Sequence, residues 1–517
     1  MSKRCAKVRH GFHQAKWDEE LIFELHKPGE RGLAVAPVEP GIAAEVGDGL
    51  GALPPALVRR TQPLLPEVGQ MRVLKHFLRL SQENLGADLN VDIGQGTCTM
   101  KYSPKINDAL AASPRLADLH PLQDPATVQG TLEVMHSLDL YLREISGMDR
   151  FSLQPASGSS AILNMVSIIQ AYHRDRGEAQ TRDEMITTIF SHPSDAAAAA
   201  VKGYKVVTLM QGPDGLPTVE DLRRAVGPRT AGLLITNPED TGIYNPSVQE
   251  FVRLVHEAGG LCGYDQANAN GIMGVTRAAD CGFDLCFFNL HKTFSTPHGC
   301  GGPAGGALGV TMALADYLPV PLVVREGERY RLDYGVPRSI GKTRAFYGTV
   351  QVALRAYAWI RALGADGLRE VSAVAVLNNN YLLEKIKRIR GASAPYAEGH
   401  RRIEQVRYSW EQLHRDTGVT TEDISLRMAD YGMHLWSSHH PFIVPQPFTV
   451  EPTESYAKEE LDEYVAVLEQ VASEAYADPQ LVRTAPHRSV CRRVDPAPFD
   501  DPGRWAVTWR LWQRKAK

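Results

Sequence analysis

The chain has 517 residues and a net charge of −4, with 43% hydrophobic and 22% charged residues. This is the composition of an ordinary globular protein that can bury a sizeable core, and the length favours roughly two to four structural units. The balanced charge predicts no nucleic-acid partner, and the apolar runs are too short to cross a bilayer, so no membrane association is expected.

The cysteines indicate a reducing environment. There are seven, they are scattered, and none forms a CxxC pair. The pattern predicts neither a disulfide framework nor a metal site, and reduced thiols are typical of a cytoplasmic protein. Residues 1–20 are basic but no apolar stretch follows them, so no secretory signal is expected.

The chain divides into three segments by composition. Residues 1–70 are rich in Pro and Gly and predict an extended N-terminal arm. Residues 71–335 alternate short apolar stretches with helical periodicity, which indicates a large α/β domain with a mostly parallel sheet and helices on both faces. Residues 336–517 predict a smaller C-terminal α+β domain that ends in a surface tail from Pro486.

The expected strands of the large domain lack polar alternation, which indicates burial on both faces. They are predicted at 187–190, 205–209, 232–236, 261–265 and 285–289. Helical spacing joins Ile162, Met165, Ile169 and Tyr172, and later Phe251, Leu254 and Val255. Longer helices are expected at 344–363, 367–388 and 458–476.

The most informative window for chemistry is FDLCFFNLHKTFSTPHGCGGPAGG at 283–306. An expected buried strand ends at Asn289 and is followed by His291, Lys292, a run of hydroxyl residues and a glycine cluster. A lysine at the carboxyl end of a parallel strand lies where α/β sheets place ligands. Burial and neighbouring cations favour the neutral amine that a nucleophile needs, and the glycine amides suit an anionic ligand. The alternative is a surface lysine beside a glycine turn.

Two polar residues follow neighbouring expected strands. Asp265 ends the strand at 261–265, where a buried acid is costly unless it is paired. Asn237 precedes Pro238 at the end of another strand and has an amide that can bind a phenolic oxygen. Taken alone, Asp265 fits a helix N-cap and Asn237 fits simple turn chemistry.

Two further segments suit a flat, phosphorylated ligand. Ser157, Gly158 and Ser159 directly precede an amphipathic helix, whose N-terminal amides and dipole favour a phosphate. His192 follows a strand, where its ring is able to stack on a cofactor. Their ordinary alternatives are a serine N-cap and a loop histidine.

These weak signals occur in one order: phosphate loop, stacking ring, asparagine, aspartate, lysine. Their spacing fits the strand ends of a single sheet. The combination predicts an enzyme that carries pyridoxal phosphate (PLP) as an imine on Lys292, with Asp265 paired to the pyridine nitrogen so that the ring remains an electron sink.

At these windows the chain resembles glycine decarboxylase, the P-protein of the glycine cleavage system, and most of all the carboxy-terminal subunit of its two-subunit form. The resemblance covers nearly the whole chain and implies the aminotransferase-like PLP fold (fold type I). Its most specific motif is NLHKTFSTPHG at 289–299. The others are GTCTMKYSPKIN (96–107), LHPLQDPATVQG (119–130), LQPASG (153–158), ITNPEDTG (235–242), YDQANANGIMG (264–274), KTRAFYG (342–348), LNNNYL (377–382), EPTES (451–455) and PHRSVCRR (486–493).

The resemblance implies a role for each matching residue. Lys292 would hold PLP, Asp265 would bind its ring nitrogen, and His192 would stack on the ring and act in catalysis. Asn237 would lie near the ring hydroxyl, and His291 would neighbour the imine as a further catalytic group. The cofactor contacts are completed by Ser157, Gly158, Ser159 and Asn268, and the substrate side is formed by Thr99, Lys101 and Tyr102.

Several positions depart from the pattern of this family. Where the family reads close to AAGAHGE, the chain has ASGSSAI at 156–162, and HGTNP becomes HPSDA at 192–196. DGAN becomes DQAN at 265–268, a glycine of the GGGG run is Cys300, and HEF becomes IEQ at 403–405. Asp195 replaces an asparagine, and a carboxylate there would repel a phosphate, so we expect it on the substrate side.

The residues and the resemblance leave three alternative functions. The first is glycine decarboxylase: PLP binds glycine, CO2 leaves, and the aminomethyl group passes to the lipoyl arm of a carrier protein, with a related partner subunit. The second is a paralogous PLP enzyme, working as a homodimer without a lipoyl partner, that breaks a bond at the α-carbon of a different small amino acid. The third, a PLP-free scaffold, has no need for Lys292 and Asp265 together.

Overall fold

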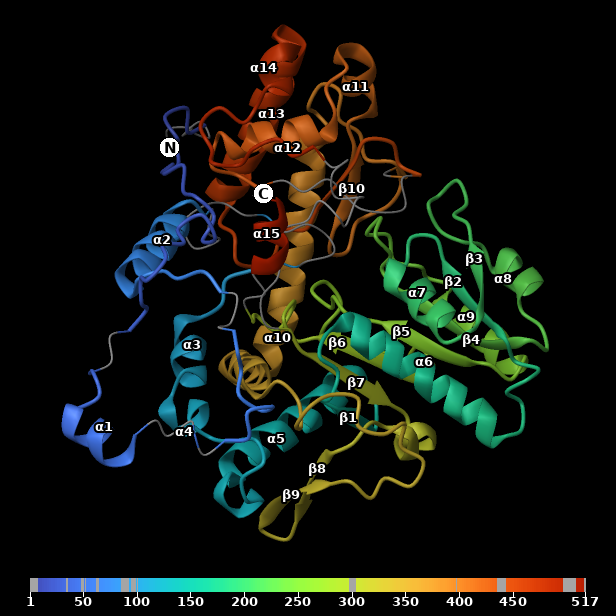
Figure 1. The fold of residues 1–517 in the computed structure, drawn as a ribbon. Coiled ribbons are helices and arrows are strands. Elements are labelled where there is room, and N and C mark those ends of the chain that lie inside the picture. Colours follow the sequence, from blue (N-terminus) through green and yellow to red (C-terminus); the bar gives the residue numbers. More distant parts are fainter. Residues whose placement is uncertain are drawn as a thin grey trace. The chain divides into compact units, whose positions relative to one another are not determined.

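The computed structural model describes residues 8–33, 36–47, 51, 53–61, 65–84, 93, 99, 101–296, 304–396, 398–434, 443–495 and 508–515. Its contacts define two compact units, whose elements are labelled in Figure 1. Unit 1 comprises Met1–His10 and Gly86–Ala485, and unit 2 comprises Gly11–Leu85 and Pro486–Lys517.

These units do not follow the three predicted segments. Residues 71–85 and the tail from Pro486 group with the arm, and most of the two predicted domains shares unit 1. The helix at 70–82 buries only His76 among its residues, so it has little apolar contact through which to join a large core. The division of unit 1 into a large and a small domain stays a prediction.

Unit 1 contains a seven-stranded sheet in the order β1-β7-β6-β5-β4-β2-β3. Neighbours from β6 to β3 are parallel, whereas β7 pairs antiparallel with both β6 and β1. The bounds are β1 (Arg150–Ser152), β2 (Glu184–Thr188), β3 (Lys205–Leu209), β4 (Thr230–Thr236), β5 (Leu261–Asp265), β6 (Leu285–Asn289) and β7 (Gly306–Val310). The predicted α/β class with a mostly parallel sheet is confirmed.

Three of the predicted strands have the predicted bounds, namely β3, β5 and β6. β4 begins two residues before the predicted 232–236, and the prediction of a strand at 187–190 was wrong because β2 ends at Thr188. The first residues of β2 were not predicted because the strand begins with the polar Glu184. Ile189 and Phe190, which were predicted as strand, belong to the following turn. β1 and β7 were not predicted, since one is very short and the other has the small-residue sequence GALGV.

Alternate residues of β2, β4, β5 and β6 face two different cores. The edge strand β3 buries only Leu209, so the predicted burial on both faces was wrong for 205–209. Met185 and Leu234 pack with residues of α6 (Gly158–Asp175) and α7 (Pro193–Val201), and α6 lies along the sheet in Figure 1. Ile186 and Leu233 point the other way and pack with α5, α9 and α10. Because both faces are covered, the strands are apolar on both sides, which accounts for the missing polar alternation.

The other helices of unit 1 connect or cover these strands. They are α3 (Lys105–Ala111), α4 (Pro114–Ala117), η2 (Pro125–Thr127), α5 (Gln129–Ser146), α8 (Val219–Ala225), α9 (Val248–Glu257), η3 (Met312–Tyr317), α10 (Val350–Ile386), α11 (Glu411–Thr417), α12 (Thr421–Ala429), α13 (Lys458–Ala477) and α14 (Pro479–Arg483). A separate hairpin joins β8 (Leu322–Glu326) and β9 (Arg329–Asp333).

The long helix α10 begins at Val350, six residues after the predicted start at 344. Its backbone leaves helical geometry at Gly364, where φ is 67° and ψ is −176°. A glycine adopts positive φ at little cost, so the helix breaks there into two parts. The break lies between the two helices predicted at 344–363 and 367–388, and the predicted helix at 458–476 corresponds to α13.

A second core of unit 1 surrounds the antiparallel pair β10 (Val406–Ser409) and β11 (Pro447–Val450). Trp410 and Phe448 stack there with ring centroids 5.0 Å apart, among apolar residues of α12 and α13. Glu404 lies two residues before β10, and Glu451 directly follows β11. The pairing of these two strands thereby places two carboxyl groups at one end of this core.

Unit 2 joins segments from the two ends of the chain. The arm contains α1 (Pro40–Val46) and α2 (Gln70–Gln82), and the tail contains α15 (Trp509–Lys515). Phe23 packs on Trp509 with ring centroids 5.7 Å apart, and the amide of Gln14 donates to the carbonyl of Arg488 at 3.0 Å. The arm is therefore held by the tail, which was predicted to be a separate surface extension.

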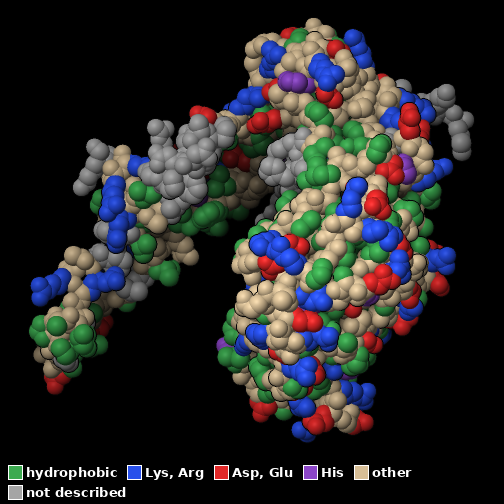
Figure 2. All heavy atoms as spheres, turned by 90° about the vertical axis from the view of Figure 1, so that its right-hand side faces the viewer, with side chains coloured by type: hydrophobic (Ala, Val, Ile, Leu, Met, Phe, Trp, Pro, Cys, Tyr) green, Lys and Arg blue, Asp and Glu red, His purple; other side chains and the backbone are tan. Residues whose placement is uncertain are grey.

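Charges of both signs are distributed over the described surface of unit 1 (Figure 2). On the face of unit 1 that Figure 2 shows, Lys and Arg side chains are interspersed with Asp and Glu, and the described residues there form no continuous basic stripe. Within the described ranges, no helix combines the length and apolar character required to cross a membrane.

Candidate active site

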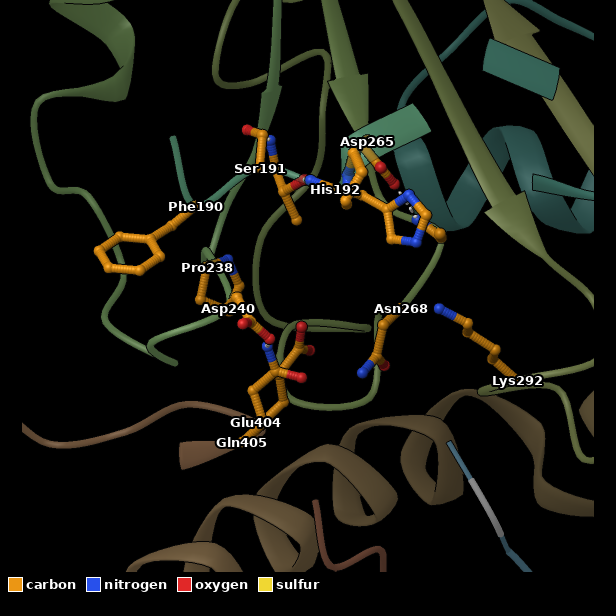
Figure 3. A pocket seen from close by; sticks show the side chains of 13 residues that line it. Phe190, Ser191, His192, Pro238, Asp240, Asp265, Asn268, Lys292, Glu404 and Gln405 are labelled. Atoms are coloured by element: carbon orange, nitrogen blue, oxygen red, sulfur yellow. Dashed lines mark hydrogen bonds between the residues drawn. The ribbon is translucent and has the colours of Figure 1, made fainter. Parts of the chain in front are cut away.

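A pocket lies at the carboxyl ends of β2, β4, β5 and β6 (Figure 3). Its walls surround about 470 Å³, part of which is open to solvent. The lining residues are Phe190, Ser191, His192, Pro193, Thr236, Pro238, Asp240, Asp265, Ala267, Asn268, Lys292, Glu404 and Gln405. This is the edge at which α/β sheets bind ligands.

Lys292 lies in the turn that follows β6. Its amide donates to the carbonyl of Asn289 at 3.0 Å, which folds the chain back after the strand. The residue is only 7% exposed, and in Figure 3 its amine points into the pocket beside Asn268. A buried amine at a strand end, facing an open pocket, is well placed to attack a carbonyl carbon.

Asp265 ends the neighbouring strand β5 and lines the same pocket as Lys292. One carboxyl oxygen accepts a hydrogen bond from the amide of Ala267 at 2.8 Å. Burial raises the pKa of Asp265, while the Ala267 amide and the charge of Lys292 act in the opposite direction. The two residues therefore share one cleft, which is the arrangement that the PLP prediction requires.

His192 and Asn268 complete the part of the pocket that matches the predicted residues. His192 is the N-cap of α7, and its Nδ1 accepts the amide of Ser194 at 3.1 Å. This contact holds the imidazole at the pocket wall shown in Figure 3. Asn268 follows β5, and its side-chain amide donates to Glu451.

The predicted phosphate loop lies at the start of α6, outside the lining of the pocket. Ser157 is the N-cap of this helix, and its hydroxyl accepts the amide of Ser160 at 3.3 Å. A Cβ at Gly158 would lie 2.7 Å from the side chain of Asn289, so a larger residue there would require that side chain to move. Ser159 is the next residue of the same helical turn. The glycines at 299, 301 and 302 lie outside the described residues.

Asn237 and His291 are buried but do not line the pocket. The Asn237 side chain closes the loop after β4, because its oxygen accepts the amide of Asn245 at 2.8 Å and its nitrogen donates to the Asn245 carbonyl at 3.3 Å. The Nδ1 of His291 lies 3.2 Å from the carbonyl oxygen of Gly305. The loop contacts of Asn237 match the turn chemistry that was the alternative for it.

The expectation that Asp195 lies on the substrate side is not met by its position. It is the third residue of α7, it is fully buried, and it is absent from the pocket lining. Its carboxyl group contacts that of Asp265. Its position in the first turn of α7 therefore brings it to Asp265 at the end of β5.

The segment predicted for the substrate side contacts two glutamates and the turn after Lys292. The Thr99 hydroxyl donates to Glu451 at 2.7 Å, and the Lys101 amine donates to the Thr293 carbonyl at 2.8 Å. The same amine pairs with Glu454 at 2.8 Å. Tyr102 is 55% exposed, so of the three residues it is the one open to solvent.

Glu404 and Glu451 are two carboxyl groups near Lys292 for which we predicted no role. Glu404 lines the pocket and accepts the amide of Gly271 at 3.2 Å, while Glu451 is fully buried. Burial raises the pKa of Glu451 to about 7 and that of Glu404 well above its ordinary value. Raised carboxyl pKa values of this kind are typical of functional sites.

A signal for these glutamates was present in the sequence. Both lie in quoted segments, IEQ at 403–405 and EPTES at 451–455. The sequence spacing between either glutamate and Lys292 follows no helical or strand period. The two glutamates come near Lys292 because they flank β10 and β11, which belong to a different core. Phe190, Asp240 and Gln405 were missed for the same kind of reason, since they reach the pocket from turns.

A buried acid next to the pocket gives a stability prediction. Glu239 is fully buried, and burial raises its pKa from 4.5 to about 8, despite the nearby Thr188 hydroxyl. Between these pH values the folded protein holds a proton that the unfolded chain releases, so the wild type loses stability as pH rises through this window. We expect Glu239→Gln to be more stable than the wild type at pH 8 by roughly 2–4 kcal/mol, and to match it near pH 5.

Thermal or denaturant unfolding at both pH values measures this difference. Glu220→Gln is the matched control, because the Glu220 side chain on α8 is 65% exposed. It is expected to change stability little at either pH. A gap for Glu239→Gln that is the same at pH 5 and pH 8 would contradict the assignment of a buried, neutral acid.

The residues present fit the predicted cofactor. An amine, a carboxylate and an imidazole meet at one pocket, each held by a backbone contact of its own. Lys292 and Asp265 are 7% and 2% exposed, so both are withdrawn from water. A flat ring with an aldehyde on one side and a basic nitrogen on the other matches these groups.

Comparisons with known proteins agree with this arrangement. The family model "Aminotransferase class-V" matches residues 156–303, and "Glycine dehydrogenase, C-terminal domain" matches residues 371–487. The probable glycine dehydrogenase (decarboxylating) subunit 2 of Pyrococcus abyssi is 46% identical over 505 residues, which cover 97% of this chain and 98% of the relative. The protein of that name from Caldanaerobacter subterraneus is 42% identical, with 92% and 96% covered.

Solved structures share the fold. A crystal structure of glycine decarboxylase (P-protein) of the glycine cleavage system, in inhibitor-bound form, has a TM-score of 0.70 and 20% identity, covering 85% of this chain and all of that one. A cysteine desulfurase from Escherichia coli has a TM-score of 0.57 and 16% identity, covering 76% and 97%.

The fold and the pocket define a PLP-dependent enzyme of the aminotransferase-like class, fold type I, and this confirms the predicted fold, cofactor and enzyme class. Within that class, the chain belongs to the glycine dehydrogenase (decarboxylating) subunit 2 family. The resemblance seen in the sequence motifs is thereby confirmed.

Proposed function

We propose that this chain is the subunit of a glycine decarboxylase that binds PLP and releases CO2 from glycine. The observation that carries the proposal is the meeting of Lys292 and Asp265, from the ends of neighbouring strands, at one pocket. The naming of relatives that match over nearly the full length supports glycine as the substrate.

PLP, when bound, accepts the electron pair that remains when CO2 leaves. Lys292 would hold the cofactor through its Nζ, and Asp265 would keep a proton on the ring nitrogen. His192 would lie against the face of the ring. The phosphate would be bound at the start of α6 by the amides of Gly158 and Ser159 and by the hydroxyl of Ser157.

The substrate side must accept a carboxylate although the pocket is rich in acids. Asp240 is neutralised by Arg407, whose Nη1 lies 2.9 Å from its carboxylate. Burial raises the pKa of Glu404 well above its ordinary value, which disfavours a second negative charge on this side of the pocket. These two features support the binding of the substrate carboxylate beside Lys292.

The partners follow from the family. The relatives are named subunit 2, which supports a related partner subunit for this chain. A lipoyl carrier protein as the acceptor of the aminomethyl group belongs to the same proposal. A homodimer without such a carrier is the arrangement expected of the alternative paralogue.

The test is the exchange of labelled bicarbonate into glycine. Purified chain is loaded with PLP and assayed with a related partner subunit and a lipoyl carrier, with each component omitted in turn. We expect exchange only in the complete mixture, together with a visible absorption band from the imine on Lys292.

Other outcomes separate the alternatives. A coloured protein that gives no exchange but turns over a different small amino acid would favour the paralogue. A protein that stays colourless with excess PLP would overturn both enzyme functions. Titration of the coloured protein with glycine, alanine and serine compares the substrates directly through changes of the band.

A further inference from the structure

Two buried aspartates contact each other at the pocket wall, where Asp265 lines the pocket and Asp195 does not. Asp195, in the first turn of α7, is 0% exposed, and Asp265, at the end of β5, is 2% exposed. Their carboxyl groups are in hydrogen-bond contact. Among the described residues, no N–H or hydroxyl group donates to either oxygen of Asp195, so its polar contact is the other carboxyl group.

The surroundings of the pair are asymmetric. Asp265 receives the amide of Ala267 at 2.8 Å, faces the amine of Lys292 and lies near the Thr236 hydroxyl. Glu404 is a further acid on that side. For Asp195, in contrast, the neighbouring ionisable group is the carboxyl group of Asp265. Every stabilising contact for a negative charge is therefore on Asp265.

Ionisation of two adjacent, buried carboxyl groups with one nearby cation is strongly disfavoured. One proton must remain between them, and it stays where the negative charge is least stabilised. That position is Asp195. In agreement, burial and the charge of Asp265 raise the pKa of Asp195 well above its ordinary value.

We propose that Asp195 is a positioning residue that retains its proton and donates a hydrogen bond to Asp265, which keeps Asp265 ionised as the partner of the cofactor ring nitrogen. The role toward the cofactor rests on the proposed function. The protonated state itself does not, because it arises from residues of the chain alone.

The proposal sets the pH behaviour of the site. As pH rises through the pKa of Asp195, a second negative charge appears beside Asp265 and the hydrogen bond to it is lost. Wild-type affinity for PLP should then fall at alkaline pH. Asparagine has an N–H donor at the same place and does not titrate, so Asp195→Asn should lack this part of the fall.

The first test uses infrared spectra of the chain without cofactor, with 13C in the side-chain carboxyl of aspartate only. Near pH 8 we expect the band of a protonated aspartic acid in the wild type and its loss in Asp195→Asn. The label excludes the buried glutamates Glu239, Glu404 and Glu451 from the signal. Absence of the band in the wild type, or its persistence in the variant, would overturn the proposal.

Because that measurement needs neither PLP nor glycine, its failure is distinct from failure of the proposed function. The second test is PLP affinity. Asp195→Asn should stay within about threefold of the wild type near pH 7, whereas Asp195→Leu, which has no donor, should bind at least roughly tenfold more weakly. Equal affinities for the two variants would contradict a hydrogen-bond role.

A folding control decides how the leucine variant is used. If circular dichroism shows that Asp195→Leu does not fold, the comparison rests on Asp195→Asn alone. Its PLP affinity should remain level as the pH is raised into the alkaline range, while that of the wild type falls. A parallel fall of both proteins would overturn the role of Asp195 in the pair.

Discussion

Replacement of Lys292 by alanine is expected to abolish glycine–bicarbonate exchange, with a loss on the order of 10⁴-fold or more. The amine is the group in the pocket that can hold the cofactor covalently, and it is placed by the turn after β6. The visible absorption band of the imine should disappear at the same time, while PLP remains able to bind without the covalent bond. Exchange kinetics and absorption spectra measure both effects.

A matched control is Lys205→Ala on β3, whose side chain is 67% exposed and pairs with Asp183 at 3.0 Å. It removes a lysine from the same sheet but away from the pocket, so activity and spectrum should stay near those of the wild type. If Lys292→Ala kept the band or more than a small fraction of the exchange, another amine would have to hold the cofactor.

Replacement of Asp265 by alanine is the second change with a large expected effect. Without a carboxylate at the end of β5, the ring nitrogen has no anionic partner and the cofactor is a poorer electron sink. We expect PLP to bind more weakly but detectably, and the exchange rate to fall on the order of 10²–10⁴-fold. Asp265→Asn, which keeps the shape but loses the charge, should resemble the alanine variant in rate.

The control for charge removal is Asp280→Ala, since Asp280 is 56% exposed and pairs with Arg277 at 2.8 Å outside the pocket lining. Its exchange rate should be unchanged. Near-normal turnover in Asp265→Asn would show that a carboxylate at this position is not required, and would remove the basis for the assignment of Lys292 and Asp265 as a pair.

The sequence predicted the parts of the fold that depend on local pattern. β3, β5 and β6 are five-residue segments without polar alternation that lie between turns, and their bounds were predicted to the residue. Strand ends then located Asp265 and Lys292, because the carboxyl ends of parallel neighbours meet at one edge. β1 and β7 are paired antiparallel at the side of the sheet and have no such pattern.

The parts that were missed depend on contacts between distant segments. Glu404 reaches the pocket only because β10 and β11 pair, and no periodicity relates it to the sheet. Asp195 was placed on the substrate side from its charge, whereas the first turn of α7 directs it to Asp265. The direction of a side chain in a helix depends on its position around the helix axis. The identity of one substituted residue gives no information about that position.

The construction of unit 2 has a consequence for biosynthesis. The aromatic residues Phe23 and His26 lie against Trp509, with ring centroids 5.7 and 5.1 Å apart. During translation, Phe23 and His26 are synthesised long before Trp509. The nascent arm therefore cannot bury these two rings until nearly the entire polypeptide has been made. Premature termination anywhere after unit 1 would leave the arm with an uncovered aromatic surface, a ready target for chaperones and proteases.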